Sequence, residues 1–124
     1  MLTGDYVINI LIDLATRLAR VNEAAKRAKA GGDLRAMRAL YCEKDDVMSD
    51  AICLESPQWT NIHYHLDPVL GVTVLLRLPL GGGRWRCFHA PFWRLTRAAQ
   101  DVVRGALGDP NDFADHVRNE PPHN

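Results

Sequence analysis

Two pairs of possible metal ligands stand near the middle of this 124-residue chain. His63 and His65 form one pair, and Cys87 and His89 form the other. Residues two apart on a β-strand share one face, so two such pairs on neighbouring strands could supply the four nitrogen and sulfur ligands that zinc prefers. The thiol and imidazole of the second pair could also form a nucleophile and its base. Which chemistry is open to them depends on the strands that carry them.

A triple glycine at positions 81–83 separates two stretches with alternating apolar residues, 72–79 and 84–89. The glycines lack the Lys-Ser/Thr of a phosphate-binding loop and lead into a strand, so we interpret them as a hairpin turn. A tight turn at the first two glycines predicts three cross-strand pairs on one apolar face, Leu78 with Trp85, Leu76 with Cys87 and Val74 with His89.

In that register Cys87 and His89 face the core, whereas His63 and His65 occupy the polar positions of their own strand. The two pairs then lie on opposite faces of the sheet, and we expect no metal and no cofactor. Residues two apart on one strand also point alongside each other, and the sequence offers no third group to orient an imidazole. We therefore expect that the protein is not an enzyme.

The same register places Arg77 directly opposite Arg86, with Arg84 diagonal to the pair and Phe88 exposed beside it. Like charges directly opposite each other destabilise a strand pair, so an anion should compensate them. An internal carboxylate is one alternative. A nucleic-acid phosphate or an acidic patch on a partner protein is the other.

Charge is arranged in blocks, although the formal net charge is zero. Lys and Arg are in excess in residues 1–42 and 68–108, and Asp and Glu are in excess in 43–67 and 109–124. Segregated charge on a neutral protein predicts charged surfaces that bind partners locally, rather than a long-range electrostatic field around the whole molecule. The densest acidic cluster consists of Glu43, Asp45, Asp46 and Asp50.

The chain begins with a heptad pattern, in which apolar residues from Val7 to Ala28 recur at alternating spacings of four and three. The pattern predicts one amphipathic helix over about residues 5–29, with Thr3 or Asp5 as its N-cap. Either the other elements of the fold cover the whole apolar face of this helix, or the uncovered part forms the interface of a two-fold homodimer.

A second, less regular helical pattern follows Gly31-Gly32 and ends before Pro57. The glycines end the first helix, and Asp33 can cap the second. The residue before a proline is pushed out of the helical region. So short a glycine turn predicts an antiparallel helical hairpin.

A period of two begins after Pro57 and gives a first strand, ahead of the two strands of the glycine hairpin. A helical period resumes at Trp93 and stops at Gly108. The order α-α-β-β-β-α predicts an α+β fold, an N-terminal helical hairpin and a three-stranded antiparallel sheet with helices on one face. The acidic segment from Asp109 is short of apolar residues, so we expect at most one helical turn there.

Length and composition are those of one ordinary soluble domain, with 47% hydrophobic and 24% charged residues. We expect a domain at 1–108 and a partly ordered acidic tail at 109–124. The longest apolar run, at 6–12, is too short for a bilayer. Three widely spaced cysteines and the lack of a leader pattern predict a reducing cytoplasm.

These features favour a non-enzymatic protein-binding domain, a small inhibitor or adaptor that docks through segregated charged surfaces onto a partner that handles nucleic acid. A phage-encoded inhibitor of host defence, with acidic segments that imitate a phosphate backbone, is one concrete form. The expected binding residues are Arg77, Arg84, Arg86, Phe88, Glu43, Asp45, Asp46 and Asp50. The alternative is direct nucleic-acid binding through Arg77, Arg84, Arg86, Arg94 and Arg97, without a recognised motif.

Overall fold

The computed structural model describes residues 4–55 and 61–120. Two helices, three strands and a further helix follow in the predicted order, and a fourth helix comes last. The elements are α1 (Gly4–Ala30), α2 (Leu34–Glu55), β1 (Ile62–Asp67), β2 (Gly71–Gly81), β3 (Arg84–Pro91), the 3-10 helix η1 (Phe92–Arg94), α3 (Arg97–Leu107) and α4 (Pro110–Asn119). The predicted α+β fold is confirmed. None of the helices in the described ranges is long and apolar enough to cross a membrane.

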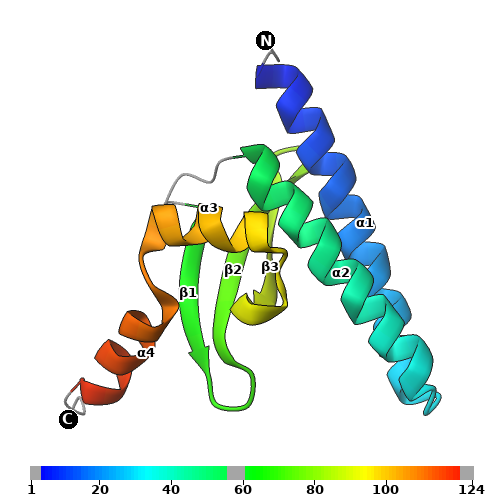
Figure 1. Cartoon of the computed structure of the whole chain (residues 1–124). Helices are drawn as coiled ribbons and strands as arrows, with labels where there is room; N and C mark the ends of the chain where they lie inside the picture. The colour runs from blue at the N-terminus through cyan, green and yellow to red at the C-terminus, as the bar shows by residue number, and fades with distance from the viewer. Residues whose placement is uncertain (1–3, 56–60, 121–124) are drawn as a thin grey trace.

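The helices α1 and α2 form the predicted antiparallel hairpin, and the N-terminal end of α1 extends beyond both α2 and the sheet (Figure 1). Gly32 takes a positive φ of 74°, which reverses the chain at the low cost that glycine allows. The Asp33 carboxylate then accepts the Ala36 N–H at 3.0 Å, so the predicted cap of α2 is confirmed. Because α1 begins at Gly4, Asp5 lies inside the helix and Thr3 lies outside the described residues.

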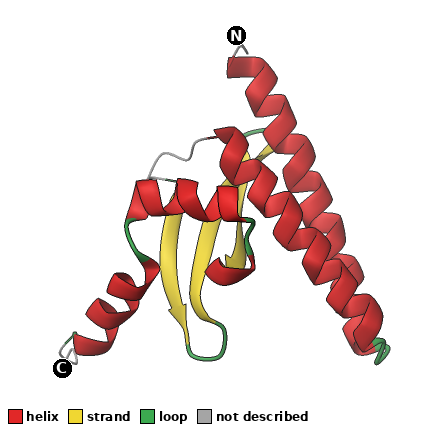
Figure 2. Cartoon of the chain, viewed as in Figure 1, coloured by secondary structure: helices red, strands yellow, loops and turns green. Residues whose placement is uncertain are grey.

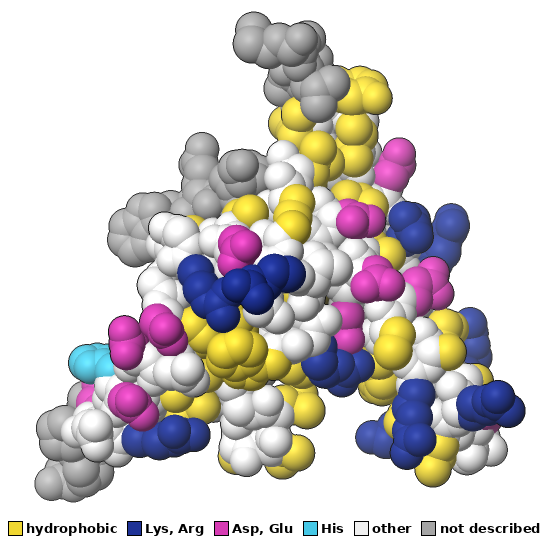
Figure 3. All heavy atoms as spheres, viewed as in Figure 1, with side chains coloured by type: hydrophobic (Ala, Val, Ile, Leu, Met, Phe, Trp, Pro, Cys, Tyr) yellow, Lys and Arg dark blue, Asp and Glu magenta, His cyan; other side chains and the backbone are white. Residues whose placement is uncertain are grey.

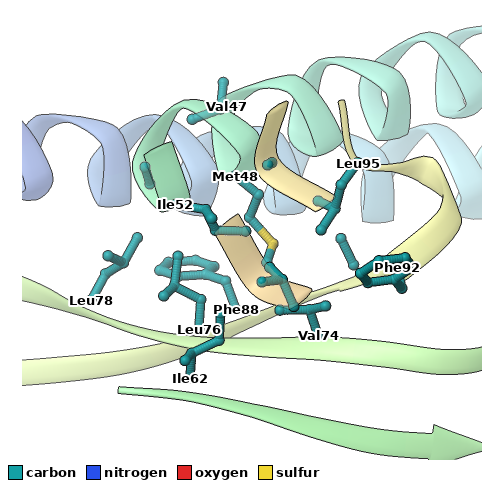
Figure 4. Close-up of a cluster of buried hydrophobic side chains, with 14 of the residues drawn as sticks. Val47, Met48, Ile52, Ile62, Val74, Leu76, Leu78, Phe88, Phe92 and Leu95 are labelled. Atoms are coloured by element: carbon teal, nitrogen blue, oxygen red, sulfur yellow. The ribbon is translucent and has the colours of Figure 1, made fainter. Parts of the chain in front are cut away.

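The sheet is antiparallel in the order β1-β2-β3, with the hairpin along its β3 side and α3 across it (Figure 2). Alternate residues of the strands are buried against the helices. In Figure 4, Met48 and Ile52 of α2 lie above Leu76 and Phe88, with Val74 beside them. Fully burying side chains of this size stabilises the fold by about 1.5–3 kcal/mol each.

The predicted register of the glycine hairpin is wrong by one residue. Gly81 stays in β2 opposite Arg84, and Gly82 and Gly83 form the turn with φ of 59° and 74°. An irregularity between Pro79 and Gly81 takes up the extra residue. Three consecutive glycines let the turn form at either pair, so they do not fix the register. The observed partners are Leu76 with Phe88, Leu78 with Arg86 and Val74 with Ala90, in place of Cys87, Trp85 and His89.

The segment after the sheet is held to α2 by one hydroxyl. Ser49 donates its hydroxyl hydrogen to the Asp45 carbonyl at 2.8 Å and accepts the Thr96 N–H at 3.1 Å. Thr96 in turn caps α3 by accepting the Ala99 N–H at 3.3 Å. This joins the start of α3 to the middle of α2.

The expectation of at most one helical turn after Asp109 is wrong, because α4 runs from Pro110 to Asn119. Asp109 caps it by accepting the Asn111 N–H at 2.7 Å, and a proline suits the first helical position. The ring of Phe113 lies 5.2 Å from that of Tyr64 in β1. The cap, the Phe113 contact and the burial of Pro110 and Ala114 against the core together order this acidic segment.

The surface of the hairpin is divided by chemistry. Hydrophobic side chains gather at the N-terminal end of α1, and Lys and Arg side chains gather at the opposite end of the hairpin (Figure 3). Tyr6 and Ile8 are 53% and 48% exposed, so the other elements of the fold do not cover the whole apolar face of α1. A homodimer through this helix stays a prediction.

Candidate functional site

The face of the sheet turned away from the core carries most of the residue types that could do chemistry. We call it the outer face. It consists of His63, His65, Thr73, Leu75, Arg77, Trp85, Cys87 and His89. Pairing across β2 aligns His63, Leu75 and His89 in one row. The imidazoles and Arg77 are exposed, whereas Thr73 in the central strand is buried.

A cation-aromatic pair marks the turn end of the outer face. The Arg77 guanidinium carbon lies 4.9 Å from the centroid of the Trp85 ring. Trp85 is 47% exposed, and its strand neighbour across the hairpin is Pro79. The two side chains hold each other in place, and such exposed contacts contribute about 0.5–1 kcal/mol.

The carboxylate of Asp67 lies beside the outer face and is already bound within the protein. Asp67, at the end of β1, accepts the N–H groups of Leu70 and Val69 at 2.8 Å each. These bonds to the charged form hold the pKa of Asp67 below its ordinary value. On the opposite edge, burial and then the charge of Lys44 lower the pKa of His89. The outer face is therefore neutral to cationic at neutral pH.

Two predicted basic-face residues lie elsewhere because of the shifted register. Phe88 is 1% exposed, so the prediction of an exposed stacking ring is wrong. Arg86 faces the helices, with its guanidinium 5.3 Å from the Phe88 ring, and it is not opposite Arg77. Arg77 pairs with Cys87 instead, and Arg84 is exposed beside the turn.

The acidic cluster of α2 is divided between core and surface. Asp45 is 5% exposed and binds the Arg94 guanidinium at 2.9 Å, so an internal partner occupies it. Its pKa is raised by burial, an effect that Arg94 opposes. Glu43, Asp46 and Asp50 remain exposed on α2.

The predicted separation of the two ligand pairs onto opposite faces is wrong. His63, His65, Cys87 and His89 all belong to the outer face. However, β2 lies between the two pairs, which places them about 10 Å apart, two strand spacings. Among the described residues no three His, Cys, Asp or Glu side chains come together as a metal site.

Lys44 is a buried cation that none of the sequence predictions included. It is 6% exposed, although it stands in the most acidic block of the chain. Its position three residues after Tyr41 and four before Met48 places it on the inward side of α2. This spacing is the feature of the sequence from which the burial of Lys44 could have been predicted.

Comparison of the chain with protein-family models, with curated proteins and with solved structures found no match.

Proposed function

We propose that this protein is a non-enzymatic binding domain that docks onto a protein partner through the outer face of its sheet. The proposal depends on the half-exposed Trp85, held with the Arg77 guanidinium over its ring. Trp and Arg are the residue types that most often dominate the energy of protein interfaces. A ring that is already held in place loses little side-chain freedom on binding.

The charges of the outer face favour a partner surface with carboxylates beside an apolar recess. Arg77 forms no ion pair with any carboxylate in the described part of the chain. Asp67 is committed to its own turn. Partner carboxylates would complement Arg77, and the recess would take the exposed half of Trp85.

Direct nucleic-acid binding is the weaker alternative, because the arginines are spread over several surfaces. Arg77 is the one Lys or Arg of the outer face, Arg86 and Arg94 lie beside α2, and Arg97 pairs with Asp101 at 3.5 Å. Neutralising about one or two phosphates gives a slope of roughly −1 to −2 in log K against log salt. Dedicated binders contact roughly 6–10 phosphates.

The native cysteines allow a direct test. One variant, Cys42→Ser with Cys53→Ser, keeps Cys87 on the outer face, and a second keeps only Cys42 on α2. Each is labelled with a photo-crosslinker at its thiol and irradiated in native cell extract. We expect a discrete adduct from the Cys87 label that Trp85→Ala removes.

The captured protein is then purified and titrated with unlabelled chain. Trp85→Ala should weaken binding about tenfold or more, the effect of an interface hot spot. Trp93→Ala is the matched control, because Trp93 is similarly exposed at 54% but lies on η1. Equal affinities of wild type and Trp85→Ala would refute docking through this face. A salt-sensitive shift of single-stranded DNA that is lost in Arg77→Met would favour the alternative.

Three exposed carboxylates of α2 support a second candidate function, insertion into a basic groove in place of nucleic acid. Glu43, Asp46 and Asp50 follow each other at spacings of three and four and therefore share one helix face. A triple variant that combines Glu43→Gln, Asp46→Asn and Asp50→Asn tests them as a set. Loss of partner binding there, with retention in Trp85→Ala, would move the docking face to α2.

A further inference from the structure

A cleft separates the helical hairpin from the β3 edge of the sheet. It consists of two adjoining cavities of about 220 and 260 Å³, which share Tyr41, Lys44 and His89. We call it the Lys44 cleft. Its charged or titratable lining residues, apart from Tyr41 and Cys87, are Lys26, Lys44, Asp45, Arg86, His89 and Arg94.

Lys44 is a buried lysine that forms no direct ion pair with any residue that the structure describes. It is 6% exposed, and no hydrogen bond or ion pair joins its ammonium group to any of the described residues. An unpaired buried ammonium is destabilising, because it loses its hydration without compensation. Burial lowers the pKa of Lys44, the Asp45 charge opposes this, and the charges of Arg86 and Arg94 lower the pKa further.

The single carboxylate of the cleft compensates Lys44 only in part. Asp45 is the one carboxylate among the described residues that line the cleft, and its Oδ2 is 2.9 Å from the Arg94 guanidinium. Arg86 lies over the Phe88 ring and forms no ion pair with a described residue. Lys44 and Arg86 therefore bring two positive charges into the cleft, against one carboxylate that Arg94 already binds.

We propose that the Lys44 cleft binds a small phosphate-bearing ligand. A phosphate group at neutral pH carries about −1.5 to −2 charges, which matches Lys44 and Arg86 better than a single carboxylate does. Each cavity is smaller than the roughly 300–1,000 Å³ of sites for drug-sized molecules, so the ligand is small or enters only with its phosphate. The cleft adjoins the outer face and shares Cys87 and His89 with it, but the proposed ligand contacts are Lys44 and Arg86, which lie outside that face.

Inorganic phosphate and pyrophosphate are the probes for this site. The thermal unfolding midpoint of the full chain is followed against each anion, with sodium chloride holding the ionic strength constant. We expect a saturable increase for wild type. Lys44→Met, which keeps the apolar stem, and Arg86→Gln should each weaken the apparent affinity about tenfold or more. Lys29→Met is the matched control, because Lys29 is exposed at the end of α1.

Phosphorus NMR of the anions provides a second measurement of binding. It uses wild-type protein, so it does not depend on whether the variants fold. Wild-type protein should broaden the phosphate resonance, and pyrophosphate should reverse the broadening by competition. No saturable effect in either assay would overturn the proposal. So would an effect that persists unchanged in Lys44→Met and Arg86→Gln. Binding of single-stranded DNA without any binding of the free anions would also overturn it.

Discussion

The side chains of β3 offer a quantitative test of the fold, because Phe88 and Trp85 exchange places if the register slips by one residue. Phe88 is 1% exposed and pairs across the sheet with Leu76, in contact with the hydrophobic core. Truncating a buried phenylalanine to alanine costs about 3–5 kcal/mol, from lost transfer energy and the cavity left behind. We expect Phe88→Ala to lower the free energy of unfolding by that amount.

Trp85→Ala should cost much less. The ring is 47% exposed, so roughly 100 Å² of apolar surface is protected from water. At about 25 cal/mol per Å² the loss is at most about 2.5 kcal/mol.

Urea unfolding followed by far-UV circular dichroism measures both variants without depending on tryptophan fluorescence. A domain of this size is stable by about 5–15 kcal/mol, so either loss leaves a measurable transition. Phe88→Leu is the milder variant if Phe88→Ala does not fold. A larger loss for Trp85→Ala than for Phe88→Ala would refute the observed register.

Three further predictions concern other contacts. Arg94→Met should lower the free energy of unfolding by about 1–3 kcal/mol more than Asp45→Asn does. In Arg94→Met the Asp45 side chain, 7% exposed, keeps an unpaired buried charge, whereas in Asp45→Asn the Arg94 side chain, 44% exposed, stays hydrated. Equal losses in urea unfolding would contradict this. The Tyr64 hydroxyl donates to the Gly108 carbonyl at 2.8 Å, and burial raises the pKa of Tyr64 to about 12. The folded state therefore keeps a proton that the unfolded state loses above about pH 10, and stability falls with rising pH up to about 12. Tyr64→Phe should lower the free energy of unfolding by about 0.5–1.5 kcal/mol near pH 8. It should also reduce the loss of stability between about pH 8 and pH 12. If urea unfolding shows the same loss of stability in wild type and Tyr64→Phe, Tyr64 is not the group responsible. Gly82→Ala should cost about 1–2 kcal/mol by the same assay, because Gly82 has φ of 59° and alanine is strained there; a neutral effect would argue against the turn.

The order of elements could be predicted because the apolar period changes from helical to alternating at Pro57 and back near Trp93. The cap at Asp33 and the glycine turn before it are local signals of the same kind, and both are observed. The N-cap of α4 was also readable in principle from Asp109-Pro110. The helix was not predicted because the segment after Asp109 is acidic and has few apolar residues.

The register could not be predicted from alternation within β3 alone. Trp85 stands in one alternating set and Phe88 in the other, so each face would gain one large aromatic ring. The choice is made by contacts distant in sequence, since Phe88 and Ala90 pack against the helices. Of the four predicted basic-face residues, Arg77 alone lies on the outer face. Lys44 was missed because its neighbours in sequence are acidic, whereas its environment in the fold is cationic.

The hydroxyl of Ser49 has a consequence for how the chain is made. Its bond to Thr96 spans 47 residues, and the side chains of Met48 and Ile52 that flank it are buried by strands and a 3-10 segment that are synthesised later. A nascent chain that has completed the helical hairpin therefore exposes an apolar stripe until about forty further residues leave the ribosome. At roughly 5–20 residues per second this interval lasts about 2–8 s, far longer than the microseconds in which helices form. Synthesis should thus present a helical intermediate with an exposed apolar face, the kind of species that chaperones hold.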